Sequence, residues 1–186
     1  MERVAIFWDI DSCPVPAKLT GYEAINNIRN LAYSYGSATT FKAYVDSSNV
    51  SPARLQSVRH QFESSGLLLI EYKRGDGSNI ATHTMIADML VFAIDHPAPA
   101  TIILISGKNE LAYAASLLRH RRYQVIVVAS LSPNETLKSQ ASVILDWDVV
   151  ASQPISEKPI PEITFGSFSP FAGESRTSHY GYHWNP

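Results

Sequence analysis

Short apolar runs alternate with longer amphipathic segments over the first 150 residues of the chain. The apolar runs are not broken by alternating polar positions, which is typical of strands that are covered on both faces of a parallel sheet. We expect strands over Val4–Trp8, Thr39–Val45, Leu67–Ile70, Thr101–Ile105, Gln124–Val128 and Val143–Leu145.

The segments between these runs carry apolar residues at helical spacing and have start or stop signals at their ends. Pro52 stands near the first position of one such segment, and Gly66 follows its end. Another segment begins after Ser78 or Asn79, either of which is expected to cap it, and ends before Pro97. The expected helices cover Gly21–Tyr35, Pro52–Glu63, the capped segment through Ala93, Asn109–Arg121 and a short stretch near Asn134–Ala141.

The alternation of strands and helices predicts an α/β fold. We expect a doubly wound parallel sheet of five to six strands with helices on both faces, and we assign residues 1–150 to this domain. After about Val150 the chain is rich in Pro, Ser, Gly and aromatic residues without a regular period, which predicts a disordered tail over 151–186. The aromatic residues of the tail leave two interpretations open, a plain spacer or a segment that binds a protein partner.

Composition and charge narrow the class of protein further. The chain has 186 residues, a hydrophobic fraction of 45% and a formal net charge of −2, so any binding to nucleic acid must be local. Cys13 is the only cysteine, which excludes an internal disulfide and fits an intracellular compartment, most simply the cytoplasm. No apolar run approaches the ~20 residues of a membrane span, and no secretory leader is expected before the first strand.

Polar side chains gather where two of the predicted strands end. Asp9 and Asp11 follow the first strand, and Ser106, Lys108 and Glu110 follow the fourth. The carboxyl ends of parallel strands lie at one edge of a sheet, so these groups converge if the two strands are neighbours. Clustered carboxylates bind hard cations such as Mg²⁺, which can hold a phosphate and activate a water molecule.

Basic residues indicate where a phosphate could bind. Lys73 and Arg74 follow the third strand at the same edge and are candidates for contact with a nucleic-acid backbone. The basic run Arg119–Arg122 closes a helix and is expected at the opposite edge, where it complements the helix dipole. The histidines match no zinc-binding spacing.

Several stretches of the sequence also resemble a known family. They are VAIFWDIDSCPVP, FKAYVD, DMLVFAIDHPAPATIILISG and LAYAASLLRHRRYQVIVVAS. Over about Arg3–Asp148 the chain resembles the NYN domain of the PIN-like ribonuclease superfamily, and in particular fungal limkain-type relatives. The resemblance implies a PIN-like, Rossmann-like sheet, single-stranded RNA as partner, a Mg²⁺- or Mn²⁺-dependent endoribonuclease site and a role in post-transcriptional regulation such as mRNA stability. It also implies peroxisome association as an alternative location.

Compared with the family's usual pattern, the acidic site of this chain is incomplete. Asp11 and Ser12 stand where the family has Glu and Asn, while Thr82 and Lys108 stand at positions of aspartates. The resemblance implies that the catalytic and metal-binding residues are Asp9, Asp11 and Glu110. The residues expected to contact RNA are Ser12, Lys73, Arg74, Thr82, Ser106 and Lys108. A metal ion held by so few carboxylates would be weakly bound or lost.

Three functions follow as hypotheses from these observations. The first is an RNA-binding domain with a degraded metal site, the second an active metal-dependent endoribonuclease, and the third a non-catalytic protein-interaction module. Thr82 and Lys108, at positions where the family usually has aspartates, argue against an active endoribonuclease. The Lys108 ammonium either pairs with Asp9 or Asp11 in place of a metal ion, or points into solvent.

Overall fold

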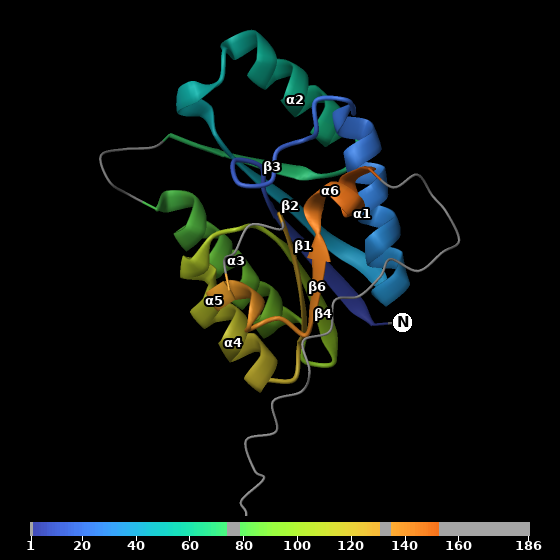
Figure 1. Ribbon diagram of the computed structural model, residues 1–186, viewed down its shortest axis with the longest axis vertical. Coiled ribbons are helices and arrows are strands. Elements are labelled where there is room, and N and C mark those ends of the chain that lie inside the picture. The colour runs from blue at the N-terminus through green and yellow to red at the C-terminus, as the bar shows by residue number, and fades with distance from the viewer. Residues whose placement is uncertain (1, 74–78, 131–134, 153–186) are drawn as a thin grey trace, which may run out of the picture.

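The structure is a computed structural model, and it describes residues 2–73, 79–130 and 135–152 (Figure 1). Its strands are β1 (Arg3–Asp9), β2 (Ser37–Asp46), β3 (Leu68–Tyr72), β4 (Ala100–Ile105), β5 (Gln124–Ala129) and β6 (Val143–Asp146). Its helices are α1 (Gly21–Tyr35), α2 (Pro52–Ser64), α3 (Ile80–Asp95), α4 (Ala112–His120), α5 (Glu135–Lys138) and α6 (Trp147–Ser152), with short 3₁₀ turns η1 (Ser47–Asn49) and η2 (Asn109–Leu111). Within these ranges no helix combines the length and the apolar character needed to cross a membrane.

All the strands are parallel and form one sheet in the order β3-β2-β1-β4-β5-β6. The chain runs outward from β1 to β3 and then returns to β4 on the other side of β1, so the predicted doubly wound α/β fold is confirmed. Trp8 of β1 lies opposite Ile105 of β4. The strand order reverses between these two strands, and parallel α/β sheets bind their ligands beyond the carboxyl ends at such a point.

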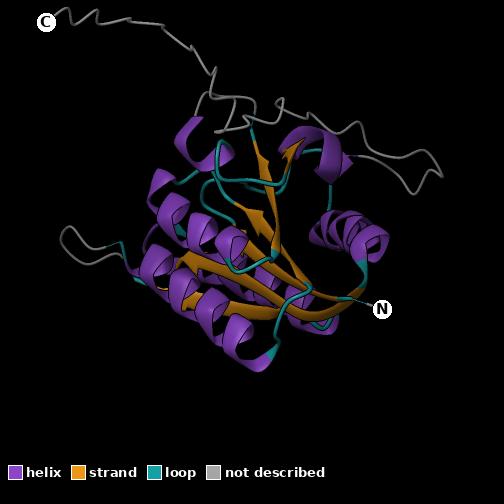
Figure 2. Cartoon of the chain, turned by 90° about the horizontal axis from the view of Figure 1, so that it is seen from below, coloured by secondary structure: helices purple, strands orange, loops and turns teal. Residues whose placement is uncertain are grey.

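Helices cover both faces of the sheet, as Figure 2 shows. Ile6 and Trp8 of β1 pack into the core formed with α1, α2 and α6. Ala5 and Phe7, which alternate with them, pack into the core formed with α3, α4 and α5. Both sides of the strand are therefore buried, which explains why its sequence is continuously apolar.

The loop after β1 is held in place by two indole groups. Trp8 stacks on Phe62 with ring centroids 5.4 Å apart, and its N–H donates to the carbonyl of Cys13 at 2.8 Å. Trp147 is the first residue of α6, and its ring centroid lies 5.4 Å from that of Trp8. Its indole N–H donates to the carbonyl of Pro14 at 2.9 Å. These bonds fix the start of the loop from which the predicted site residues emerge.

Helix α6 was not predicted, and the expected domain boundary near Val150 falls inside it. The helix is six residues long, too short to show a helical period in the sequence. Tertiary contacts stabilise it instead: Val150 and Ala151 are buried, and the side-chain amide of Asn27 donates to the carbonyl of Ala151 at 2.7 Å. The domain therefore continues at least to Ser152, and the rest of the tail predicted over 151–186 lies outside the described residues.

Two helix starts also differ from the sequence prediction. The helix expected from Asn109 begins as the 3₁₀ turn η2 and becomes α-helical at Ala112. Asn79 precedes α3, but its side chain makes no capping hydrogen bond, and Ser78 lies outside the described residues. In both cases the expected helix forms within a few residues of its predicted start.

Replacing Trp147 should destabilise the whole domain, although it lies in the last described helix. Trp147→Ala removes the ring packed on Trp8 and the bond to Pro14, so we expect a loss of about 3–5 kcal/mol in the free energy of unfolding. Trp147→Phe keeps most of the ring contact and loses the hydrogen bond, which should cost about 1 kcal/mol. Urea denaturation measures both, and a Trp147→Ala variant as stable as wild type would contradict this role for α6.

Candidate functional site

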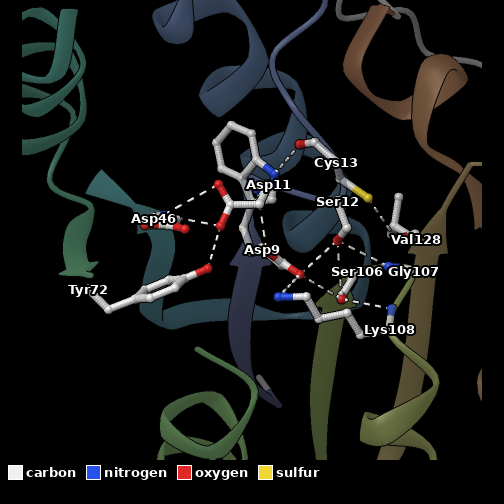
Figure 3. A network of polar contacts seen from close by, with 11 residues as sticks. Asp9, Asp11, Ser12, Cys13, Asp46, Tyr72, Ser106, Gly107, Lys108 and Val128 are labelled. Carbon is white, nitrogen blue, oxygen red and sulfur yellow. Dashed lines mark hydrogen bonds and ion pairs between the residues drawn. The ribbon is translucent and has the colours of Figure 1, made fainter. Parts of the chain in front are cut away.

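The Asp9 carboxylate lies at the centre of a polar network at the carboxyl edge of the sheet (Figure 3). Asp9 is the last residue of β1 and is only 1% exposed. Its Oδ2 lies 3.0 Å from the Lys108 ammonium and accepts hydrogen bonds from the hydroxyls of Ser12 at 2.8 Å and Ser106 at 3.2 Å. Removing a carboxylate from water is costly, and these donors offset that cost.

Lys108 pairs with Asp9, which decides between the two alternatives that the sequence left open. The lysine follows β4, and β4 lies beside β1, so the strand order brings the two side chains together. The Lys108 side chain is 25% exposed, whereas that of Asp9 is 1% exposed. The Lys108 side chain therefore pairs with a buried carboxylate and is itself partly accessible to solvent.

The serine hydroxyls connect the loops that follow the two strands. Ser12 Oγ lies 3.3 Å from Ser106 Oγ and accepts the backbone N–H of Gly107 at 3.2 Å. Ser106 Oγ accepts the backbone N–H of Lys108 at 3.2 Å. The same residues that solvate Asp9 thus also fix the backbone that carries its cation.

Asp11 points away from Asp9, toward Asp46 and Tyr72 (Figure 3). Its carboxylate accepts the backbone N–H of Asp46 at 3.1 Å and the phenol of Tyr72. Burial raises the pKa of the Tyr72 phenol above its ordinary value, and the hydrogen bond to Asp11 raises it further. The Tyr72 phenol therefore remains a hydrogen-bond donor at neutral pH. Asp9 and Asp11 thus have different partners, Lys108 for the first and Tyr72 for the second.

The other predicted site residues that the structure describes, Glu110, Thr82 and Lys73, lie outside the hydrogen-bond network around Asp9. Glu110 lies in η2 at the same edge of the sheet as Asp9, but it is exposed. Thr82 lies in the first turn of α3 and is 2% exposed, so its hydroxyl is not presented to a ligand on the surface, and it has no hydrogen-bond partner in the described part of the chain. Lys73 is exposed directly after β3, and Arg74 lies outside the described residues.

The donor set at this edge does not fit a divalent metal ion as it is arranged. Among the described residues no group of three or more His, Cys, Asp or Glu side chains could hold a metal ion. Oδ2 of Asp9 already takes an ammonium and two hydroxyls, and Asp11 faces Tyr72. Mg²⁺ needs several oxygen ligands at short distance and would have to displace Lys108.

A second ion pair, which sequence reasoning missed, lies under α3. Lys42 and Tyr44 of β2 project on the same side of the sheet and both contact Asp88, at 2.7 Å from Nζ and 2.6 Å from the phenol oxygen. Burial raises the pKa of the Tyr44 phenol, and Asp88 raises it further. The signal in the sequence was a lysine within an apolar strand and an aspartate within an apolar helix. The pair anchors α3 on the sheet.

Cys13 is a buried thiol and not an exposed nucleophile. It is 0% exposed, and its Sγ lies 4.0 Å from the carbonyl of Val128. Burial raises its pKa from about 9 to about 12. The thiol therefore stays protonated in the folded chain at neutral pH and contributes apolar packing.

Comparison with known proteins gives a consistent family assignment. The family model of the NYN domain matches residues 3–148. Proteins named "Meiosis regulator and mRNA stability factor 1" are 24% identical over 149 residues in Bos taurus and in Mus musculus, covering 80% of this chain. The match spans only 8% of the length of these relatives.

One solved structure supports the fold. It is a protein of unknown function from Vibrio parahaemolyticus, with a TM-score of 0.59 and 20% sequence identity. The superposition covers 78% of this chain and 92% of that one. At this level of identity the likeness concerns the fold alone.

Breaking the Asp9–Lys108 pair should cost more stability than breaking the Lys42–Asp88 pair. Lys108→Met leaves a carboxylate that is 1% exposed without its cation, so we expect a loss of about 3 kcal/mol in the free energy of unfolding. Lys42→Met is the matched control, since both lysine side chains are 25% exposed while Asp88 is 19% exposed and keeps more of its hydration. We expect about 1 kcal/mol for this second loss.

Urea denaturation of Lys108→Met, of Lys42→Met, of Asp9→Asn and of the Asp9→Asn/Lys108→Met double variant measures these energies. The double variant should be more stable than the sum of the single losses implies, because the amide needs no cation. Strictly additive losses at Asp9 and Lys108 would mean that the pair contributes no coupling energy.

Cys13 should make the folded domain less stable in alkaline solution. Its pKa is about 12 in the folded chain and about 9 as an ordinary thiol. Between these values the unfolded chain loses the proton first, so the free energy of unfolding falls as pH rises. Urea denaturation of wild type and of Cys13→Ala at several pH values, with reductant present, isolates the contribution of the Cys13 thiol to the free energy of unfolding. The difference between the two proteins should shrink from pH 9 upward; a difference independent of pH would contradict the buried thiol.

Proposed function

This chain belongs to the NYN domain family, and on that basis we propose that it is an RNA-binding domain in which a lysine replaces the catalytic metal ion. The observation that supports the proposal most directly is the contact of 3.0 Å between the Lys108 ammonium and the buried carboxylate of Asp9. A family site that relies on carboxylates to hold Mg²⁺ or Mn²⁺ here carries its own positive charge. Metal-dependent cleavage of RNA is therefore expected to be weak or absent.

The same residues provide the chemistry for binding a phosphate. The Lys108 ammonium has three N–H donors, of which Asp9 uses one, and a quarter of the side chain is exposed. Lys73 adds a second exposed cation at the carboxyl edge. A phosphate oxygen of an RNA strand could therefore be held without a metal ion, by lysines acting as point charges.

The names of the relatives support RNA as the partner, since they describe an mRNA stability factor. Those proteins are much longer than this chain, so a role of this chain in mRNA stability is part of the proposal. With a net charge of −2, binding must depend on a few local contacts. The slope of log affinity against log salt concentration should therefore be about −0.7 per neutralised phosphate, and only a few phosphates should be involved.

Replacing Lys108 by aspartate should shift the site from RNA binding toward metal binding. Wild type should bind single-stranded RNA in EDTA, without any requirement for Mg²⁺, and should not cleave it when Mg²⁺ is added. Lys108→Asp should bind Mn²⁺ more tightly and RNA several-fold more weakly, because the edge loses a cation and gains a ligand. Isothermal titration with Mn²⁺ and a gel assay of labelled RNA measure these effects.

Arg121→Asp is the matched control for net charge. It makes the same change at the exposed end of α4, at the opposite edge of the sheet, and should affect neither measurement. Mg²⁺-dependent cleavage by wild type, lost in Asp9→Asn, would instead establish the alternative of an active endoribonuclease. Failure of wild type to bind any RNA would leave the protein-interaction module as the remaining hypothesis.

A further inference from the structure

An open groove lies beside the Asp11 carboxylate, between the loop after β1 and helix α2. Its volume is about 600 Å³, within the range of small-molecule sites. Ile10, Val15 and Leu19 line one wall, and Leu55 and Val58 of α2 line the other, with Phe62 nearby. Asp11 belongs both to this groove and to the polar network around Asp9.

The apolar stripe of α2 is left incompletely covered by the fold. Leu55, Val58 and Phe62 are spaced three and four residues apart and share one side of the helix. Of the α2 residues only Phe62 is buried, while Leu55 and Val58 remain half-buried along the groove. A helix normally buries such a stripe, so the groove exposes apolar surface that a ligand can cover.

The charged groups along the groove indicate what kind of ligand fits. Arg54 lines it and has no carboxylate partner among the residues that the structure describes. A guanidinium stacks on flat π systems and binds phosphate. The Asp11 carboxylate accepts hydrogen bonds, and its lone pairs are not exhausted by Asp46 and Tyr72. Apolar walls with one acceptor and one such cation match a planar heterocycle that carries N–H donors and is joined to an anion.

We propose that this groove binds one nucleobase of an RNA strand whose phosphates lie at the Asp9–Lys108 edge. The proposal rests on the RNA-binding function above and adds base recognition to it. The base stacks between the apolar walls, and Arg54 contacts its face or the adjoining phosphate. Asp11 connects the two parts of the site, since it borders the groove and its backbone N–H donates to Asp9 at 3.3 Å.

Asp11 should also give the groove a preference among bases. A carboxylate accepts from the exocyclic amino groups of cytosine, adenine and guanine. In uracil the N–H is flanked by two carbonyl oxygens, which a carboxylate repels. Cytosine and uracil have the same ring size, so a preference for cytosine isolates this effect from stacking.

The decisive experiment compares wild-type binding to oligo(C), oligo(U) and an abasic oligoribonucleotide of the same length, about ten nucleotides each. Fluorescence anisotropy at one salt concentration gives the affinities. We expect oligo(C) to bind about tenfold more tightly than the abasic strand, because stacking is lost without a base. Oligo(U) should be intermediate. Equal affinity for all three would overturn the base groove while leaving phosphate binding intact, and no binding to any of them would contradict the proposed function itself.

Variants locate the effect in the groove. Val58→Trp fills it with a ring and should remove the advantage of oligo(C) over the abasic strand. Val91→Trp makes the same change on α3, where Val91 is 52% exposed, and should behave as wild type. Asp11→Asn should abolish the preference for cytosine over uracil. An unchanged preference in folded Val58→Trp would overturn the proposal, and if that variant does not fold, the wild-type comparison with the abasic strand still decides.

Discussion

The ion pair between Lys108 and Asp9 is the interaction on which the chemistry of this domain depends. A carboxylate that is 1% exposed at the mouth of a parallel sheet requires a positive charge or several donors. The family's pattern leaves room for a metal ion at such a place, whereas this chain provides an ammonium 3.0 Å away. The positive charge beside Asp9 is thereby supplied by a side chain of the protein itself.

The fold was accessible from the sequence because the central strands β1, β4 and β5 are buried on both faces and therefore appear in the sequence as apolar runs. The convergence of Asp9 and Lys108 followed from one topological fact, the pairing of β1 with β4. Helix α6 was not accessible, since six residues show no period and its position depends on Trp8 and Asn27, far away in the chain. The same holds for the site: residue types were predictable, but the choice of Lys108 between Asp9, Asp11 and solvent depended on side-chain geometry.

The two aspartates at the carboxyl edge of the sheet have different environments. Asp9 is buried and paired with Lys108, whereas Asp11 is exposed, accepts a hydrogen bond from Tyr72 and borders the groove along α2. In the proposed function this separation gives the two carboxylates different roles, with Asp9 fixing the cation that binds phosphate and Asp11 accepting hydrogen bonds from a base. Glu110, which is exposed, takes no part in this account.

The most direct test of the central claim is a crystal structure of the wild-type protein grown or soaked with excess Mn²⁺ and measured at the manganese absorption edge. Anomalous scattering locates the ion independently of any assumption about the site. The account predicts no manganese peak beside Asp9, with the Lys108 ammonium within hydrogen-bonding distance of its carboxylate. A strong manganese peak coordinated by Asp9, with Lys108 displaced into solvent, would contradict it.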